Sequence, residues 1–265
     1  MESSSFYVQL PSNASMDLYP SNKLCCYKTQ LPRTLNFDGK YEVGLVEIQY
    51  PNTWKTFRHD HSYEIRMQYM PNFGNENFTW DAVQRARCEI PKAQYETFSE
   101  LIETVERAIN KEAASHGWGR RIISIFDMKV ERKLAFVIAQ DFHIRFSEEF
   151  RSMVGGLDEY VYHTGRIETK QRYDLQNGFH SLYVYSDICE PQFVGDVMAP
   201  LLRTVALRGK RGEYISKIFD VPHYIPVALN GINSIEINIK DDTGEDVSFL
   251  DGKVVCKLHF RPKTI

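Results

Sequence analysis

Short runs in which every second residue is apolar lie near both ends of this chain of 265 residues. Residues 6–10 alternate Phe, Val and Leu with Tyr and Gln, and residues 235–240 alternate three isoleucines with Glu, Asn and Lys. Residues 254–260 repeat the pattern. A period of two places one face of a strand in a core and the other toward water. We therefore expect half-buried antiparallel strands at both ends of the chain.

Further strands are expected along the first and last thirds of the sequence. A strand over residues 24–31 is expected to end at Pro32, and a longer one over 41–50 is expected to stop at Pro51. The longer strand carries apolar residues on both faces, which favours a central place in its sheet. Turns are predicted at 36–40, 195–196 and 241–244, where Asp and Gly occur together. The remaining predicted strands cover 182–188, 201–207 and 214–219.

One long amphipathic helix is predicted in the middle of the chain. Thr97 and Glu100 form a capping-box pair at its start, and Gly117 provides a stop. Its apolar stripe, at spacings of three and four residues, consists of Phe98, Leu101, Ile102, Val105, Ala108 and Ile109. Around this helix the sequence predicts a strand at 61–70, an exposed loop at 71–81, a hairpin from 122–128 and 133–139, a short strand at 142–146 and a short helix from Ser147 to Gly155-Gly156.

This order predicts a mainly β protein, an antiparallel jelly-roll β-sandwich with an α+β insertion. The sandwich is expected to consist of residues 1–58 and 176–265. The insertion, residues 59–175, contains the long helix, the hairpin and the short helix. Two successive β domains are the alternative, but one long helix with its hairpin argues against a second sandwich.

Charge and composition exclude several classes of protein. The net charge is −3, so the chain lacks the overall basic field of proteins that bind DNA by charge. Aromatic residues make up 13%, a share that suits strands and interfaces. The start shows no signal-peptide pattern, and the longest apolar run, residues 134–139, is far below the roughly 20 residues of a membrane span. We expect a soluble protein made in the cytoplasm, without membrane contact.

No motif predicts catalysis, a cofactor or a metal. The chain has five cysteines, an odd number, and none of them form a CxxC pair. We therefore expect reduced thiols that pack as small apolar side chains. His59, Asp60 and His61 are the most metal-like group, but Glu64 and Gly74 do not fall at the spacing of a cupin-type site. A polar turn is favoured there. The Gly-rich stretch 209–212 lacks the spacing of a phosphate-binding loop, and no GxSxG sequence occurs.

Two basic clusters remain as candidates for contact with nucleic acid or an acidic partner. Solvated loops are the alternative for both. The first consists of Arg120, Arg121, Lys129, Arg132 and Lys133, and the second of Arg203, Arg208, Lys210, Arg211 and Lys217.

Several stretches together resemble one family in their order and spacing. They are FYVQLPSNAS at 6–15 with YPSN at 19–22, YEVGLVEIQYP at 41–51, and the C-terminal series YVYSD at 183–187, GDV at 195–197, PLLR at 200–203, IEINIKDDTG at 235–244 and LHFR at 258–261. The middle matches more loosely, through its helix, FSEEF at 146–150 and MVGG at 153–156. In these stretches the chain resembles the minor capsid (penton-like) proteins of Polinton/Maverick transposons and adintoviruses.

The resemblance implies a structural protein without catalytic, cofactor or metal residues. It implies a single jelly-roll penton that forms homopentamers at the five-fold vertices of an icosahedral capsid, beside a double jelly-roll major capsid protein. The expected location is the virion, after synthesis in the host cytoplasm, with at most weak contact with packaged DNA. The interface residues are not identified, although the loops 71–81 and 209–212 are candidates. The alternative is a non-catalytic jelly-roll binding module for a glycan or protein, encoded by a capsid gene that a host has retained.

Overall fold

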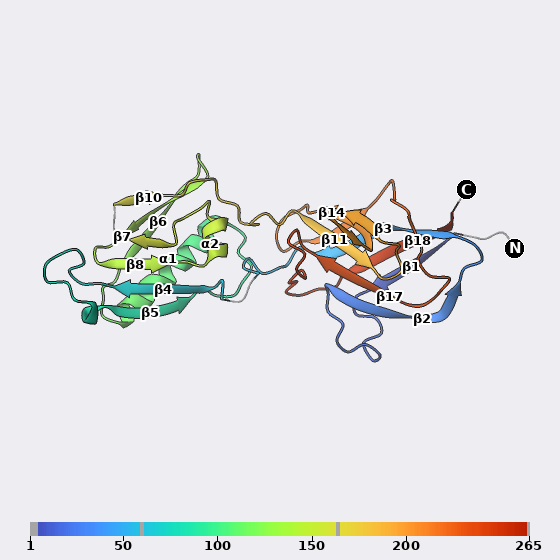
Figure 1. Ribbon diagram of the computed structural model, residues 1–265, viewed down its shortest axis with the longest axis horizontal. Coiled ribbons are helices and arrows are strands. Elements are labelled where there is room, and N and C mark those ends of the chain that lie inside the picture. The colour runs from blue at the N-terminus through green and yellow to red at the C-terminus, as the bar shows by residue number, and fades with distance from the viewer. Residues whose placement is uncertain (1–4, 59–60, 163–164, 264–265) are drawn as a thin grey trace. The chain divides into compact units, whose positions relative to one another are not determined.

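A computed structural model describes residues 5–58, 61–162 and 165–263. The chain divides into two compact units, Met1–Trp54 with Phe179–Ile265 (unit 1) and Lys55–Gly178 (unit 2). The colours of Figure 1 show that unit 1 joins the blue start of the chain to its orange and red end. The predicted division, after residue 58 and before residue 176, differs from this one by a few residues at each crossing.

Two antiparallel sheets form the sandwich of unit 1. The first has the order β1 (Phe6–Pro11), β18 (Val255–Pro262), β3 (Tyr41–Pro51) and β15 (Tyr214–Ile218), and β16 (Ile225–Pro226) also pairs with β3. The second has the order β14 (Leu201–Ala206), β11 (Ser181–Ser186), β17 (Gly231–Lys240) and β2 (Cys26–Asn36). The chain passes repeatedly between the sheets, so most neighbouring strands are distant in sequence. This is the strand order of a jelly roll, and the predicted fold class is confirmed.

The alternating strands supply the core between these sheets. Ile235, Ile237 and Ile239 of β17 are fully buried, as the period of two predicts. The Tyr27 hydroxyl of β2 donates to the carbonyl oxygen of Leu10 in β1 at 3.1 Å, so a buried polar group also links the two sheets. β3 lies between β18 and β15, which confirms its predicted central place.

One strand boundary was predicted wrongly. β2 continues through Pro32 to Asn36 instead of ending at the proline. The strand lies at the edge of its sheet, where a residue without an N–H group can be tolerated. Its register with β17 also shifts between Ile232 and Ser234, opposite the segment that contains Pro32.

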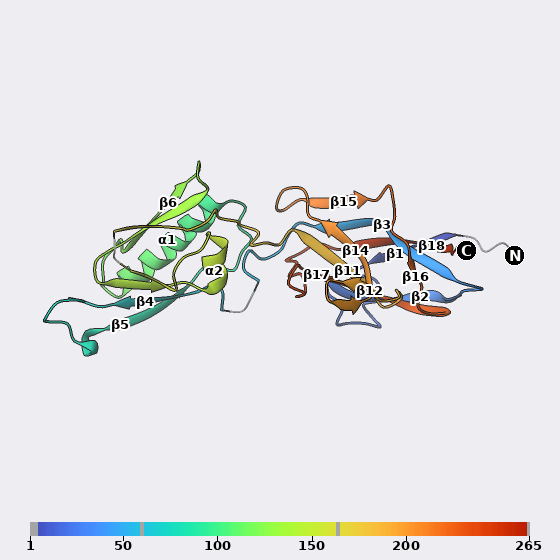
Figure 2. The ribbon, with the colours of Figure 1, turned by 45° about the horizontal axis from the view of Figure 1, so that its top comes forward.

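Unit 2 contains two more antiparallel sheets and both helices. One sheet has the order β5 (Gln84–Glu89), β4 (Glu64–Tyr69), β8 (Phe142–Arg145) and β9 (Tyr160–Tyr162), and the other β10 (Arg166–Glu168), β7 (Lys133–Ile138) and β6 (Ile123–Met128). A short 3-10 helix, η1 (Trp80–Ala82), precedes β5. Helix α1 (Phe98–Ser115) packs against β5 and β6, and α2 (Glu148–Met153) follows β8 (Figures 1 and 2). The predicted hairpin is β6–β7, whereas the sequence analysis did not anticipate β5, β9 or β10.

Helix α1 begins and ends where the sequence predicts. The Thr97 hydroxyl accepts from the amide of Glu100 at 3.2 Å, and Gly117 adopts a φ of +73° after the last turn. The carboxylate of Glu100 accepts from the amide of Glu96, one residue before the partner of a standard capping box. The buried side of the helix carries Phe98, Leu101, Ile102, Val105 and Ile109.

In each unit, the two residues next to the points where the chain passes to the other unit lie close together. In unit 1, the rings of Trp54 and Phe179 meet edge to face with centroids 4.9 Å apart. In unit 2, the guanidinium of Arg58 donates to the carbonyl oxygen of Asn177 at 3.2 Å. The residues on either side of each crossing are therefore held close within their own unit. Within the described ranges, no helix combines the length and apolarity needed to cross a bilayer.

Candidate interaction surfaces

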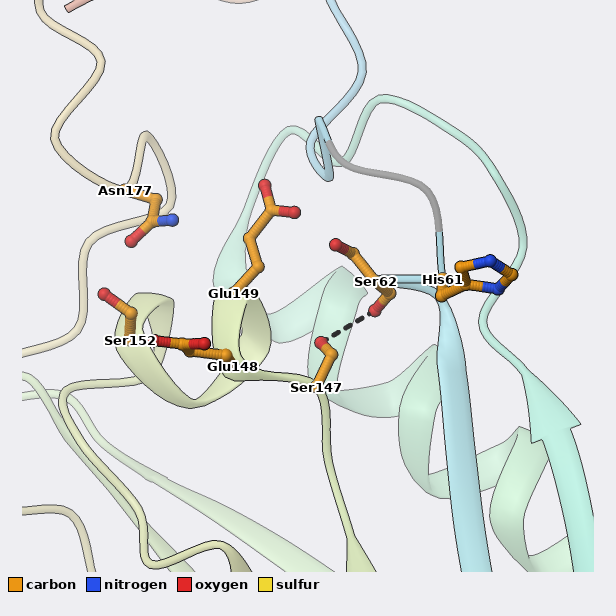
Figure 3. A pocket seen from close by; sticks show the side chains of 7 residues that line it. All are labelled: His61, Ser62, Ser147, Glu148, Glu149, Ser152 and Asn177. Carbon is orange, nitrogen blue, oxygen red and sulfur yellow. Dashed lines mark hydrogen bonds between the residues drawn. The ribbon is translucent and has the colours of Figure 1, made fainter. Parts of the chain in front are cut away.

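A polar pocket of about 520 Å³ opens beside α2 in unit 2 (Figure 3). The Ser147 hydroxyl donates to the carbonyl oxygen of Ser62 at 2.8 Å and accepts from the amide of Phe150 at 3.2 Å, so it caps α2. The pocket is lined by His61, Ser62, Ser147, Glu148, Glu149, Ser152 and Asn177. The role of the Ser147 hydroxyl is thus to cap α2.

Glu149 is the buried acid of this pocket. Its carboxylate accepts from the amide of Arg58 at 2.8 Å and lies 3.9 Å from the Nε atom of the same residue. Glu149 thus ties α2 to the segment that leads into β4. Figure 3 shows its side chain directed toward the space between Ser62 and Asn177, while the ring of His61 points away from the other lining residues. The pocket geometry is that of a structural ion pair and a helix cap.

The proposed metal-like group is only partly described. His59 and Asp60 lie outside the described residues. His61 occupies a turn before β4 with a φ of +66° and is exposed. Among the described residues, no three His, Cys, Asp or Glu side chains are grouped as metal ligands would be. The five cysteines are free thiols, and burial raises the pKa of Cys189 and Cys256 to about 12.

Two arginines of the first basic cluster have partners within unit 2. Arg121 donates to the Ser124 hydroxyl at 2.9 Å and to Glu106 at 3.4 Å. The guanidinium of Arg132 lies 5.7 Å from the ring centroid of Tyr173. These contacts direct the two arginines to partners within unit 2.

The second cluster converges in part on one aromatic ring. The guanidinium of Arg203 lies 3.8 Å from the ring centroid of Phe219 and donates to the carbonyl oxygen of Val221 at 3.2 Å. The Lys217 ammonium lies 5.9 Å from the same ring. Partial burial lowers the pKa of Arg203. Lys210 belongs to the exposed loop, where its amide donates to the carboxylate of Glu213.

The outer face of the β1–β18–β3–β15 sheet carries a row of aromatic and basic side chains that the sequence analysis missed. The rings of Tyr7 and His259 stack with centroids 4.5 Å apart, and the Tyr224 hydroxyl lies 2.8 Å from the Nδ1 atom of His259. The guanidinium of Arg261 lies 3.5 Å from the centroid of the Tyr224 ring. Burial and, to a lesser extent, Arg261 lower the pKa of His259. The sequence did contain most of this row, as the alternate residues of β1 and β18 that face away from the core.

A short hairpin between β11 and β14 was also missed. It consists of β12 (Gln192–Val194) and β13 (Val197–Ala199), joined by the predicted Gly195-Asp196 turn with a φ of +61° at the glycine. Phe193 pairs with Met198 across the hairpin, and these side chains are 87% and 56% exposed. Val197 is 55% exposed. The turn was predictable, but the two strands are too short to show a period.

A groove of about 790 Å³ runs between the two edge strands β1 and β2. We call it the β1–β2 groove, and it is lined by residues 6–9, residues 29–37 and Tyr41. The rings of Phe6 and Phe37 stack with centroids 6.5 Å apart, and Phe6 also stacks on Phe260 at 5.1 Å. The floor is therefore aromatic and continuous with the core of unit 1.

Comparisons with known proteins place this fold beside a capsid protein. No protein-family model matches the sequence, and no curated protein matches it. Among solved structures, the chain is similar to the penton protein of mavirus, crystallised in selenomethionine-labelled form, with a TM-score of 0.50 and 11% identity. That similarity covers 97% of this chain and 99% of the mavirus chain. Both units therefore take part in a likeness of fold to a viral penton protein.

Proposed function

We propose that this chain is a structural, penton-like minor capsid protein that forms homopentamers at the five-fold vertices of an icosahedral capsid. The observation that carries the proposal is the likeness of fold to the mavirus penton protein along nearly all of both chains. A likeness restricted to the sandwich would fit any jelly-roll protein, because this fold serves many functions. Here the likeness of fold also covers the insertion between β3 and β11.

The surfaces of unit 1 suit a subunit that contacts other proteins. The outer sheet face offers Tyr7, Tyr224 and Arg261, residue types that are enriched in protein interfaces. Phe193 and Met198 lie exposed on the β12–β13 hairpin. Large exposed apolar side chains that lie together mark interaction sites more often than isolated ones do.

The proposal extends to partners and location. The vertex protein would assemble beside a double jelly-roll major capsid protein, and it would reside in the virion after synthesis in the host cytoplasm. Contact with packaged DNA would be weak, because the net charge is −3 and Arg121 and Arg203 already have partners within the chain.

A non-catalytic binding module for a glycan or protein is the second candidate. The β1–β2 groove favours it, because its volume lies in the range of pockets that hold ligands. A binding module has no need to form a closed ring, whereas a vertex protein does.

The oligomeric state tests the proposal. Light scattering coupled to size-exclusion chromatography should give five times the chain mass of 30.9 kDa, and negative-stain images should show five-fold rings. Mixed with a double jelly-roll major capsid protein from the same source, the chain should occupy the vertices of assembled particles. A strict monomer at high concentration that forms no ring with that partner would refute the vertex role.

A further inference from the structure

The β12–β13 hairpin carries more exposed apolar surface than it can cover by itself. It forms a two-stranded sheet of its own, without a third strand in the described chain. Two-stranded hairpins are marginally stable in water unless they pack against something else. Phe193 is nevertheless 87% exposed and Met198 56% exposed, on the same cross-strand pair. These two side chains are positioned to enter an apolar recess.

The β1–β2 groove has the properties of such a recess. Its floor includes Phe6, Val8, Leu35 and Phe37, which are partly buried against the core. Both strands that border it are edge strands, β1 in one sheet and β2 in the other. The β2 edge is covered at one lining residue, since the Ser15 hydroxyl accepts from the amide of Gln30, and residues 31–37 of the lining follow this contact.

The charges of the hairpin and the groove are complementary. The segment that contains the hairpin, residues 187–202, carries Asp187, Glu190 and Asp196 and no Lys or Arg. Glu190 and Asp196 are exposed. Arg33 is the only charged residue in the groove lining, and it is exposed and makes no ion pair with a described residue. Opposite charge at the rim of an apolar contact gives specificity and register.

The hairpin and the groove are different surfaces of unit 1, although Glu190 before the hairpin lines a pocket with Phe37 and Tyr41 of the groove. The hairpin leaves the second sheet between β11 and β14, whereas β2 is the last strand at the other end of that sheet. Figure 2 labels β12, β14 and β2 within unit 1. A contact between two different surfaces of the same chain is heterologous and repeats head to tail. Such contacts generate a ring when the rotation between neighbours closes.

We propose that the β12–β13 hairpin of one copy inserts Phe193 and Met198 into the β1–β2 groove of a second copy, with Asp196 facing Arg33. The inference rests on the proposed function, because it supplies the subunit contact of the ring. The occupant of the groove is therefore a second copy of this chain, and each copy uses both surfaces.

Photo-crosslinking locates the contact directly. Benzoylphenylalanine is placed at position 193 of the full chain, and light- and heavy-nitrogen copies are mixed before irradiation. We expect crosslinks between copies that map to residues 6–9 or 29–41. A placement at Val130, which is 92% exposed in the β6–β7 turn, serves as the control and should give no such products. Crosslinks within one copy, to other residues or to another protein would overturn the inference.

Substitutions test the energetics of the same contact. Phe193→Ser should raise the concentration at which half the chains are assembled at least about thirtyfold, the effect of removing a hot-spot residue. At concentrations where the native chain is also monomeric, its thermal unfolding should be unchanged, because the side chain is exposed in the single copy. Val130→Ser should change neither quantity.

A charge swap tests the pairing of Asp196 with Arg33. Asp196→Arg and Arg33→Asp should each weaken assembly, and the double variant should recover most of it. Asp196 has no positive φ, so the turn accepts the replacement. Swapped variants whose effects simply add would overturn the pairing.

The outcomes separate this inference from the proposed function. A pentamer that is unchanged by Phe193→Ser and by the charge reversals leaves the vertex role intact and refutes the hairpin contact. Open chains or dimers that depend on Phe193 and Arg33 support the contact and refute the five-fold ring. A chain that stays monomeric at every concentration refutes both.

Discussion

A matched pair of isoleucines tests whether the two units are independent domains. Ile109 lies on the buried side of α1 in unit 2, and Ile237 lies in β17 of unit 1. Both are fully buried, and the two hydrophobic cores share no residue. We propose that the units unfold separately, so each Ile→Ala substitution should destabilise its own unit alone.

The expected loss follows from burial. Replacing a buried Ile by Ala costs about 2–5 kcal/mol, including the cavity left behind. In α1 the higher helix propensity of Ala returns roughly 0.5 kcal/mol, so Ile109→Ala should cost about 2–4 kcal/mol. For a unit of this size about 1 kcal/mol moves the Tm by roughly 3–5 °C, which gives a shift of about 6–20 °C.

Native-state hydrogen exchange with peptide-level mass spectrometry measures this by unit. In Ile109→Ala the most protected amides of α1 and β7 should exchange about 30- to 1,000-fold faster, while those of β17 and β18 keep their rates. Ile237→Ala should give the mirror result. Calorimetry should show one transition moved and the other in place.

Equal acceleration in both units by either substitution would refute the reasoning, because it would show one cooperative core. Ser115→Ala, at an exposed position in the last turn of α1, is the control. It should leave the protection of unit 1 unchanged and alter that of unit 2 by less than about 1 kcal/mol.

Three further predictions follow from polar contacts. Asn110→Ala should lower the free energy of unfolding of unit 2 by about 2–3 kcal/mol, since the Asn110 side chain satisfies three backbone groups just before and within β6. Asn110→Asp should cost less, and equal losses for the two variants in urea denaturation would contradict this reasoning. His259→Gln should make the Tm fall less steeply between pH 7 and pH 5. The folded-state pKa of this histidine is lowered, so the unfolded chain binds its proton first and stability is lost as the pH falls below about 6.5; an unchanged slope would count against it. Lys210→Glu with Arg211→Glu should remove any salt-dependent retention on DNA by the native chain, and a native chain that does not bind at low salt would eliminate the DNA contact altogether.

The elements that the sequence predicts well are those whose stabilisation is local in pattern. Helix α1 shows its buried stripe, its Thr97 cap and its Gly117 stop within one continuous segment. β17 shows a clean period of two because one face is buried along most of its length. In both cases, the residues that determine the element are adjacent in sequence, so a single chain is enough to identify it.

The elements that were missed depend on partners elsewhere in the chain. β5 presents only Ala86 and Cys88 inward, and neither gives a strong apolar signal; the strand exists because it pairs with β4 and packs on α1. Pro32 ends a strand in most contexts, but the edge position of β2 tolerates it.

The candidate surfaces were the hardest to predict. The β1–β2 groove joins residues 6–9 to residues 29–37, and only the jelly-roll pairing brings these segments together. The exposure of Phe193 is likewise invisible in the sequence, because an apolar residue next to a turn fits a core as well as a surface.

The sandwich can accommodate so large an insertion because its strand pairing does not pass through the insertion. β3 pairs with β18, β15 and β16, and β11 pairs with β14 and β17, so none of their partners lies between them in sequence. An unstructured connection of roughly 120 residues would cost about 3 kcal/mol more to close than a short loop. Here the insertion folds, and its two ends are joined by the bond between Arg58 and Asn177. The contact of Trp54 with Phe179 does the same for the sandwich. For unit 1 the insertion therefore acts as a short loop, so it can vary greatly in length and fold while the jelly roll keeps its register.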